Sequence, residues 1–264
     1  AIITFDPLTI PGEYELAVSA QNYQPYFQSI NVIVPQGSYV IATNLSLSSG
    51  STPYYSASVN WDLSLKNLGV ANATGVYATI TSSSPFLTII TDSIYVGNMN
   101  INADSTLYAA FSAQIAQYVE DGAIADLVVT IHFDTNESVK NSSITLNAPK
   151  FSRNGFSLTQ ISGNNDDVVD PGESYSVTVN DINSGHADIS FVNAALVSHY
   201  TLLNIENNLF PIGYMSAQYV SQAQFNIHIG DSVENGTIIP LYYRIKSGYY
   251  ETLDTLFISI GSIS

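Results

Sequence analysis

The chain has 264 residues, of which 45% are hydrophobic and only 11% are charged, with 6 Lys and Arg against 22 Asp and Glu. A formal net charge of −16 argues against nucleic acid and anionic lipid surfaces as partners, because both are bound through basic surfaces. The absence of Cys excludes disulfides, thiolate metal sites and a Cys nucleophile within the chain, and no apolar run approaches the roughly 20 residues of a membrane-spanning helix.

Short runs of alternating apolar and polar residues, broken by Gly, Pro, Asn, Asp and Ser, fill the chain from 13–18 and 29–34 onward. In the first run, Tyr14, Leu16 and Val18 fall on one face of an extended strand. Alternation with a period of two and one polar face is typical of half-buried antiparallel strands. Helical stripes are absent apart from an ambiguous stretch near 112–118. We therefore expect an all-β fold of Ig-like antiparallel sandwiches.

An internal repeat divides most of the chain into two similar halves. The segment 119–122 (VEDG) recurs as 233–236 (VENG), and apolar residues recur at the same spacing in the neighbouring strands. In this alignment Trp61 pairs with Tyr175. A second motif, 67–69 (NLG), recurs as 183–185 (NSG) with a spacing two residues longer. We assign the difference to a hairpin loop, where insertions are tolerated.

The repeat predicts two homologous β-sandwiches in tandem, at 37–149 and 150–264. Residues 1–36 belong to neither copy. One interpretation is that they are a partial Ig-like segment, the last strands of an upstream domain. The other is that they are donated strands that complete the sheet of another subunit, as in donor-strand complementation.

Several short motifs carry a resemblance to a known family. Residues 11–18 (PGEYELAV), followed by 22–26 (NYQPY) and 30–32 (INV), resemble the end of the Ig-like domain that follows the catalytic domain of gingipain-like cysteine peptidases. Residues 170–173 (DPGE) resemble the opening of Ig-like repeats in secreted Bacteroidetes-type surface proteins, and 67–73 (NLGVANA) resembles their hairpin.

The resemblance implies a non-catalytic region of a secreted or cell-surface protein, with the family's catalytic Cys and His in an upstream domain. The first copy departs from the pattern, because 48–53 (SSGSTP) stands in place of the DPGE opening.

The acidic stretch 163–173 is the strongest candidate for a metal site. Its carboxylates and amides are the hard oxygen ligands that Ca²⁺ prefers, although the spacing does not fit an EF-hand. A solvated turn rich in Asn and Asp is the alternative interpretation, since both residues favour turns. The predicted calcium ligands are Asn164, Asp166, Asp170 and Glu173.

Tyrosines number 18 and include the adjacent pair Tyr249 and Tyr250, of which one ring should point out of its strand. We predict these two as ligand-binding residues for a glycan or a protein, with ordinary sheet packing as the alternative.

Four histidines are scattered without the spacing of a zinc site, and we expect structural or surface roles for His132, His186, His199 and His228. No G-x-S-x-G elbow is present, and nothing in the sequence points to a Ser-His-Asp arrangement.

Five N-x-S/T sequons are candidate glycosylation sites. Their use requires that the protein be exported by an organism with a glycosylation pathway. They begin at Asn44, Asn72, Asn136, Asn141 and Asn235.

The function we expect is a non-catalytic, extracellular or cell-surface spacer and adhesion region with a protein or glycan partner, no nucleic acid and no membrane insertion. Two alternatives stay open. One is the subunit of a self-assembling extracellular filament that uses residues 1–36 as donated strands. The other is a carbohydrate-binding accessory module. Apart from possible Ca²⁺, we expect no cofactor.

Overall fold

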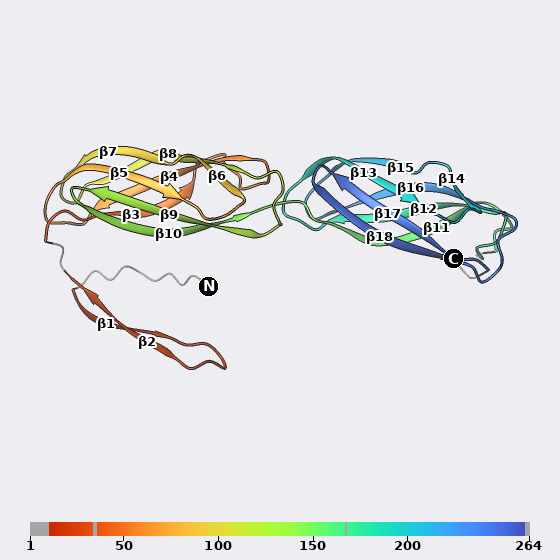
Figure 1. The fold of residues 1–264 in the computed structure, drawn as a ribbon, viewed down its shortest axis with the longest axis horizontal. Coiled ribbons are helices and arrows are strands. Elements are labelled where there is room, and N and C mark those ends of the chain that lie inside the picture. Colours follow the sequence, from red (N-terminus) through yellow and green to blue (C-terminus); the bar gives the residue numbers. More distant parts are fainter. Residues whose placement is uncertain (1–10, 34–35, 167, 262–264) are drawn as a thin grey trace.

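The computed structural model describes residues 11–33, 36–166 and 168–261. These residues form β-strands and no helix, so none of them forms a helix that could cross a membrane. The antiparallel sheets pack as sandwich-like domains, which confirms the expected all-β fold (Figure 1).

The first sandwich holds two four-stranded sheets, in the orders β3-β4-β8-β6 and β10-β9-β5-β7. Its strands are β3 (Val40–Leu47), β4 (Ser58–Asn67), β5 (Ala73–Thr81), β6 (Leu87–Thr91), β7 (Ser93–Met99), β8 (Asp104–Ile115), β9 (Ala123–Phe133) and β10 (Asn136–Leu146).

The second sandwich repeats this topology, in the orders β11-β12-β16-β14 and β18-β17-β13-β15. Its strands are β11 (Phe151–Ser162), β12 (Ser174–Asn183), β13 (Ile189–Val197), β14 (Leu203–Ile205), β15 (Leu209–Met215), β16 (Tyr219–Ile229), β17 (Ile238–Ser247) and β18 (Tyr250–Ser259). Each strand of the first sandwich has a counterpart in the second, in the same chain order, which supports the duplication inferred from the sequence.

The two-residue difference in spacing lies inside a strand and not in the hairpin loop to which we had assigned it. In the first sandwich Trp61 lies opposite Phe111 and Leu63 lies opposite Leu107, so β8 carries two more residues than β4 between these pairs. The second sandwich has no such bulge, and Val177 lies opposite Phe225. The counterpart of Trp61 is therefore Val177 and not Tyr175.

The core of each sandwich is built from alternating side chains of both sheets. Trp61, Phe111 and Leu63 are almost completely buried in the first, and Phe225 and Tyr243 are almost completely buried in the second. Full burial of one large apolar side chain contributes about 1.5–3 kcal/mol.

Strands β1 (Gly12–Val18) and β2 (Tyr26–Val32) form an antiparallel hairpin of their own. Its turn side is open to solvent, with Tyr26 59% and Phe27 57% exposed. A two-stranded hairpin alone is marginally stable in water. Both interpretations of residues 1–36 therefore stay predictions, and residues 1–10 and 34–35 lie outside the described part of the chain.

One polar pair interrupts the core of the second sandwich. The Asp181 carboxylate is fully buried; Oδ2 accepts a hydrogen bond from the Tyr243 hydroxyl, and Oδ1 has no hydrogen-bond partner in the described structure. Burial raises the pKa of Asp181 to about 6, although the bond from Tyr243 and the charge of Arg153 oppose the shift.

We expect Asp181→Asn to raise the free energy of unfolding of the second sandwich at pH 8. Because the folded pKa is raised, the folded state loses stability as pH rises from about 4 through about 6, and Asn removes this loss of at most about 3 kcal/mol. Thermal unfolding should show a melting temperature at least about 5 °C higher at pH 8, with a smaller gain at pH 4.5.

Tyr243→Phe is the matched comparison for this pair. It leaves the whole carboxylate without a partner and should lower the melting temperature at pH 8. Equal effects of Asp181→Asn at both pH values would show that the buried charge is not the cause.

Candidate functional site at the joint between the sandwiches

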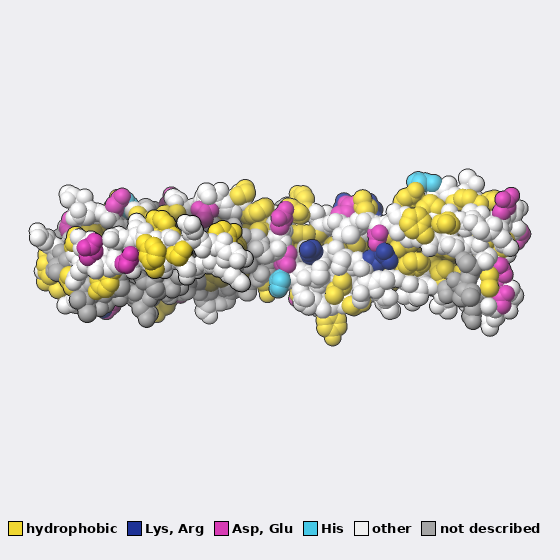
Figure 2. Space-filling model, turned by 90° about the horizontal axis from the view of Figure 1, so that it is seen from below, with side chains coloured by type: hydrophobic (Ala, Val, Ile, Leu, Met, Phe, Trp, Pro, Cys, Tyr) yellow, Lys and Arg dark blue, Asp and Glu magenta, His cyan; other side chains and the backbone are white. Residues whose placement is uncertain are grey.

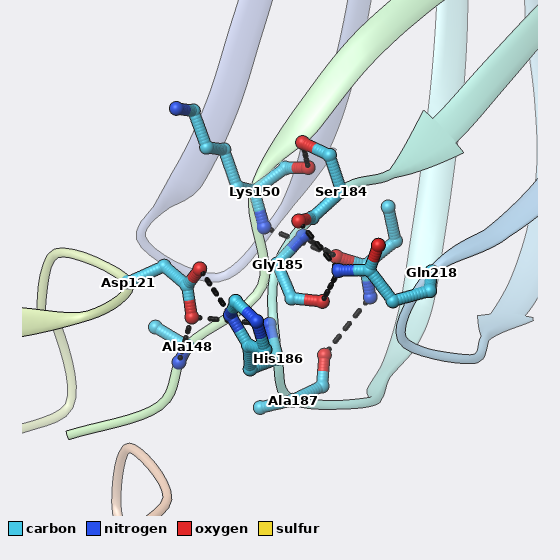
Figure 3. Close-up of polar contacts among 9 residues, drawn as sticks. Asp121, Ala148, Lys150, Ser184, Gly185, His186, Ala187 and Gln218 are labelled. Carbon is cyan, nitrogen blue, oxygen red and sulfur yellow. Dashed lines mark hydrogen bonds and ion pairs between the residues drawn. The ribbon is translucent and has the colours of Figure 1, made fainter. Parts of the chain in front are cut away.

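A clamp built from the loop that joins the two sheets of the second sandwich, between β12 and β13, holds the segment that leaves the first sandwich (Figure 3). The buried side chain of Asn183 accepts hydrogen bonds at Oδ1 from the N–H groups of Lys150, at 3.1 Å, and Gly185, at 3.2 Å. Its amide group donates to the carbonyl of Ala187, at 2.9 Å. One side chain thus ties the linker 148–150 to the loop 183–187, which connects the two sheets and is not the hairpin that the resemblance implied. We call this arrangement the second clamp.

Backbone contact completes the second clamp. The N–H of Ser184 donates to the carbonyl of Lys150 at 2.8 Å, and the N–H of His186 donates to the carbonyl of Ala148 at 3.0 Å. Gly185 lies so close to the linker that a Cβ atom there would be 2.2 Å from the Ala148 carbonyl oxygen. Glycine is required at this position because any side chain would push the linker away.

The same clamp occurs where the chain enters the first sandwich. The buried Asn67 accepts hydrogen bonds at Oδ1 from Tyr39 N–H, at 3.1 Å, and Gly69 N–H, at 2.9 Å. A Cβ atom on Gly69 would lie 2.3 Å from the Gly37 carbonyl oxygen. This first clamp holds residues 37–39 as the second clamp holds 148–150.

A carboxylate from the first sandwich extends the second clamp across the joint. Asp121 accepts hydrogen bonds from the N–H groups of Ala148 and His186, both at 3.0 Å, and its Oδ2 lies 2.8 Å from His186 Nδ1 (Figure 3). Burial acts to raise the pKa of Asp121, but these hydrogen bonds and the charge of His186 outweigh it and lower the pKa below its usual value.

Three tyrosine rings close the joint beside the clamp. The Tyr250 hydroxyl donates to the carbonyl of Val119, at 3.3 Å, and accepts from its N–H, at 3.1 Å. Its ring lies 5.1 Å from that of Tyr55 and 5.4 Å from that of Tyr118. Burial is the largest cause that raises the pKa of Tyr250 to about 12. The second sandwich therefore anchors an aromatic side chain on the first.

Of the predicted ligand-binding pair, the structure exposes Tyr249 and buries Tyr250: the two residues are 67% and 7% exposed. A ligand at the surface would meet the ring of Tyr249, whereas Tyr250 packs inside the joint.

The predicted calcium ligands all lie in one loop, but the carboxylate of one of them already accepts hydrogen bonds from the protein itself. Glu173 is buried, and its carboxylate accepts hydrogen bonds from Gln160, the N–H groups of Asn164 and Asp170, and the Tyr175 hydroxyl. Burial acts to raise the pKa of Glu173, but these bonds together lower it.

The remaining predicted ligands face one another at the surface. The amide of Asn164 donates to Asp166, at 2.9 Å, and to Asp170, at 3.2 Å. No group of three or more His, Asp or Glu side chains suited to a metal ion occurs among the described residues. The donor set that fits a cation is therefore reduced to Asn164, Asp166 and Asp170, and calcium binding stays a prediction.

The histidines lie apart from one another. His132 stacks on Tyr77 with 4.4 Å between ring centroids, His199 lies against Tyr242, and His228 contacts Ser174. All five sequon asparagines are exposed; their use as glycosylation sites stays a prediction.

The sequence did not single out Asp121 or His186 as joint residues. Asp121 belongs to the repeated segment 119–122, and its counterpart in the second copy is Asn235, so this position of the repeat is an acid in the first copy and an amide in the second. This difference between the copies is the one feature of the sequence that could have singled out Asp121.

Comparisons with known proteins leave the family open. No protein-family model matches the chain, and no curated protein matches it. Among solved structures, it is similar to the crystal structure of red sea bream transglutaminase, with a TM-score of 0.32 and 10% identity over 83% of this chain and 31% of that chain. The chain thus spans less than a third of that protein's length, and a likeness this weak carries no argument about function.

We expect Gly185→Ala to loosen the joint, because the new Cβ atom would overlap the Ala148 carbonyl oxygen and displace the linker. Limited proteolysis should then cut within 147–150 at least tenfold faster than in the parent chain. Ser184→Ala is the control, since it removes only an exposed hydrogen bond to the linker. Equal cleavage rates for both variants would contradict the clamp.

Acid should also loosen the joint. Because the pKa of Asp121 is lowered in the folded chain, its stabilising effect is present above its usual value of 3.8 and is lost as pH falls through the lowered pKa. Small-angle X-ray scattering should show a distribution of shapes that broadens as the pH is lowered from 7 to well below 3.8, and Asp121→Ala should show the broad distribution already at pH 7. A distribution that is unchanged in Asp121→Ala would exclude this carboxylate as the cause.

Proposed function

We propose that the chain is a non-catalytic spacer and adhesion region of a secreted or cell-surface protein, in which clamped joints hold Ig-like sandwiches in a fixed line. The observation that carries the proposal is the repetition of the clamp. Asn67 with Gly69 and Asn183 with Gly185 hold the incoming chain through the same hydrogen bonds at both sandwiches.

The clamp also favours one interpretation of residues 1–36. At the second clamp, the gripped segment follows β10, the last strand of the first sandwich and a partner of β9. At the first clamp, the gripped segment follows the β1–β2 hairpin. By this correspondence the hairpin takes the place of β9 and β10 in a preceding Ig-like domain. A series of such domains is the architecture that the gingipain-like resemblance implies.

The charge of the surface suits a solvated spacer. Figure 2 shows scattered acidic side chains, few basic ones and scattered hydrophobic ones on the same face, in keeping with 22 Asp and Glu against 6 Lys and Arg. A large net charge of one sign keeps protein chains apart in solution. The exposed sequons are compatible with a protein that is exported.

A spacer of this kind requires one fixed arrangement of the two sandwiches. Because the chain has no Cys, spin labels can be placed on Thr145→Cys in β10 and Gln224→Cys in β16, two exposed positions in different sandwiches. Double electron–electron resonance should give a single narrow distance distribution in the parent chain and a broad one in Gly185→Ala. A broad distribution in the parent chain would overturn the proposal.

A further inference from the structure

Phe191 adopts a backbone conformation that bulky residues rarely take. Its φ is 58°, and it lies in a bulge of β13 where the register with β15 shifts between Ile189 and Val192. The left-handed region is disfavoured for residues with a Cβ atom. The ring packs against little, because the residue is 86% exposed.

The first sandwich shows that the fold does not require Phe at this position. The corresponding bulge in β5 lies between Ala73 and Val76 and contains Gly75, with a φ of 60°. Glycine takes this conformation without steric cost. The second sandwich thus retains a strained, exposed aromatic ring where its own duplicate has glycine. Strain that the fold does not need points to a functional role.

Next to Phe191, the second sandwich has two aromatic rings that the first sandwich lacks. Tyr214 and Tyr249 are 57% and 67% exposed. Their counterparts in the first sandwich are polar: Asn98 follows Gly97 as Tyr214 follows Gly213, and Thr135 occupies the β9–β10 turn as Tyr249 occupies the β17–β18 turn.

The three rings line a hollow of about 400 Å³ beside the joint, a size within the range of small-molecule sites. Tyr55 and Gln117 contribute to its wall from the first sandwich. We propose that this hollow, which we call the aromatic hollow, binds neutral carbohydrate. The inference goes beyond the proposed spacer function, and uses the joint only because the two walls come from different sandwiches.

The polar groups of the aromatic hollow are held in place. The Tyr214 hydroxyl donates to Asp188 Oδ2 at 2.5 Å, and Asp188 Oδ1 accepts from Ala217 N–H at 2.8 Å. The Tyr55 hydroxyl donates to the Asp188 carbonyl at 3.2 Å. Fixing a side chain before binding reduces the entropy lost on association.

Carbohydrate fits this combination of groups. The apolar face of a sugar ring packs on an exposed aromatic ring, while its hydroxyl groups need donors and acceptors such as the exposed amide of Gln117 and the hydroxyl of Ser56. An apolar peptide side chain would leave these polar groups without partners. The net charge of −16 disfavours anionic sugars, so the ligand class is neutral glycans.

The test uses the full chain on an array of neutral and anionic oligosaccharides, followed by calorimetric titration of the strongest neutral binder. We expect Phe191→Gly, which copies the first sandwich, to weaken binding at least tenfold while the melting temperature stays equal or rises. Tyr249→Ala should weaken binding to a similar extent. Tyr108→Ala is the matched control, because this ring is 80% exposed in the first sandwich and does not line the hollow.

Three results would overturn the proposal. The first is no binding of any neutral glycan at millimolar concentration. The second is a glycan affinity that Phe191→Gly leaves unchanged. The third is preferential binding of an apolar peptide from a displayed library that Phe191→Gly abolishes, which would make the hollow a protein-binding site. None of these results bears on the rigidity of the joint, so the spacer proposal is tested separately.

Discussion

The arrangement of this chain depends on a buried asparagine side chain that satisfies the backbone of two segments at once. A linker between sandwiches carries N–H and C=O groups that lose water where the domains meet, and each such group costs free energy if it stays unpaired. Asn183 accepts from both the linker and its own loop, and Asn67 does the same one domain earlier. An aspartate accepts but cannot donate, so it would lose the bond to the Ala187 carbonyl.

This constraint accounts for the short motif that recurs in the sequence. The asparagine supplies the hydrogen bonds, and the glycine two residues later lets the linker approach within contact of the loop backbone. The motif therefore forms part of the joint between domains and is not only a turn. Its role cannot be found from the sequence of the loop alone, because the partner segments 37–39 and 148–150 lie about 30 residues earlier in the chain.

The all-β fold followed directly from the alternation of residues such as Tyr14, Leu16 and Val18, since a period of two is a local property of the backbone. The position of the two-residue difference between the copies did not follow, because a bulge inside β8 leaves the alternation on both sides intact. The burial of Tyr250 and the role of Asp121 were also out of reach, as both depend on how one sandwich meets the next. Duplication makes each copy a reference for the other, which is how Gly75 exposes the strain at Phe191.

Two sandwiches joined by this clamp should behave as one rigid body, and residual dipolar couplings measured on the deuterated full chain report whether they do. Couplings from strands of both sandwiches should fit a single alignment tensor of one magnitude and orientation. Two tensors of different magnitude, one for each sandwich, would show that they reorient independently and would contradict the account.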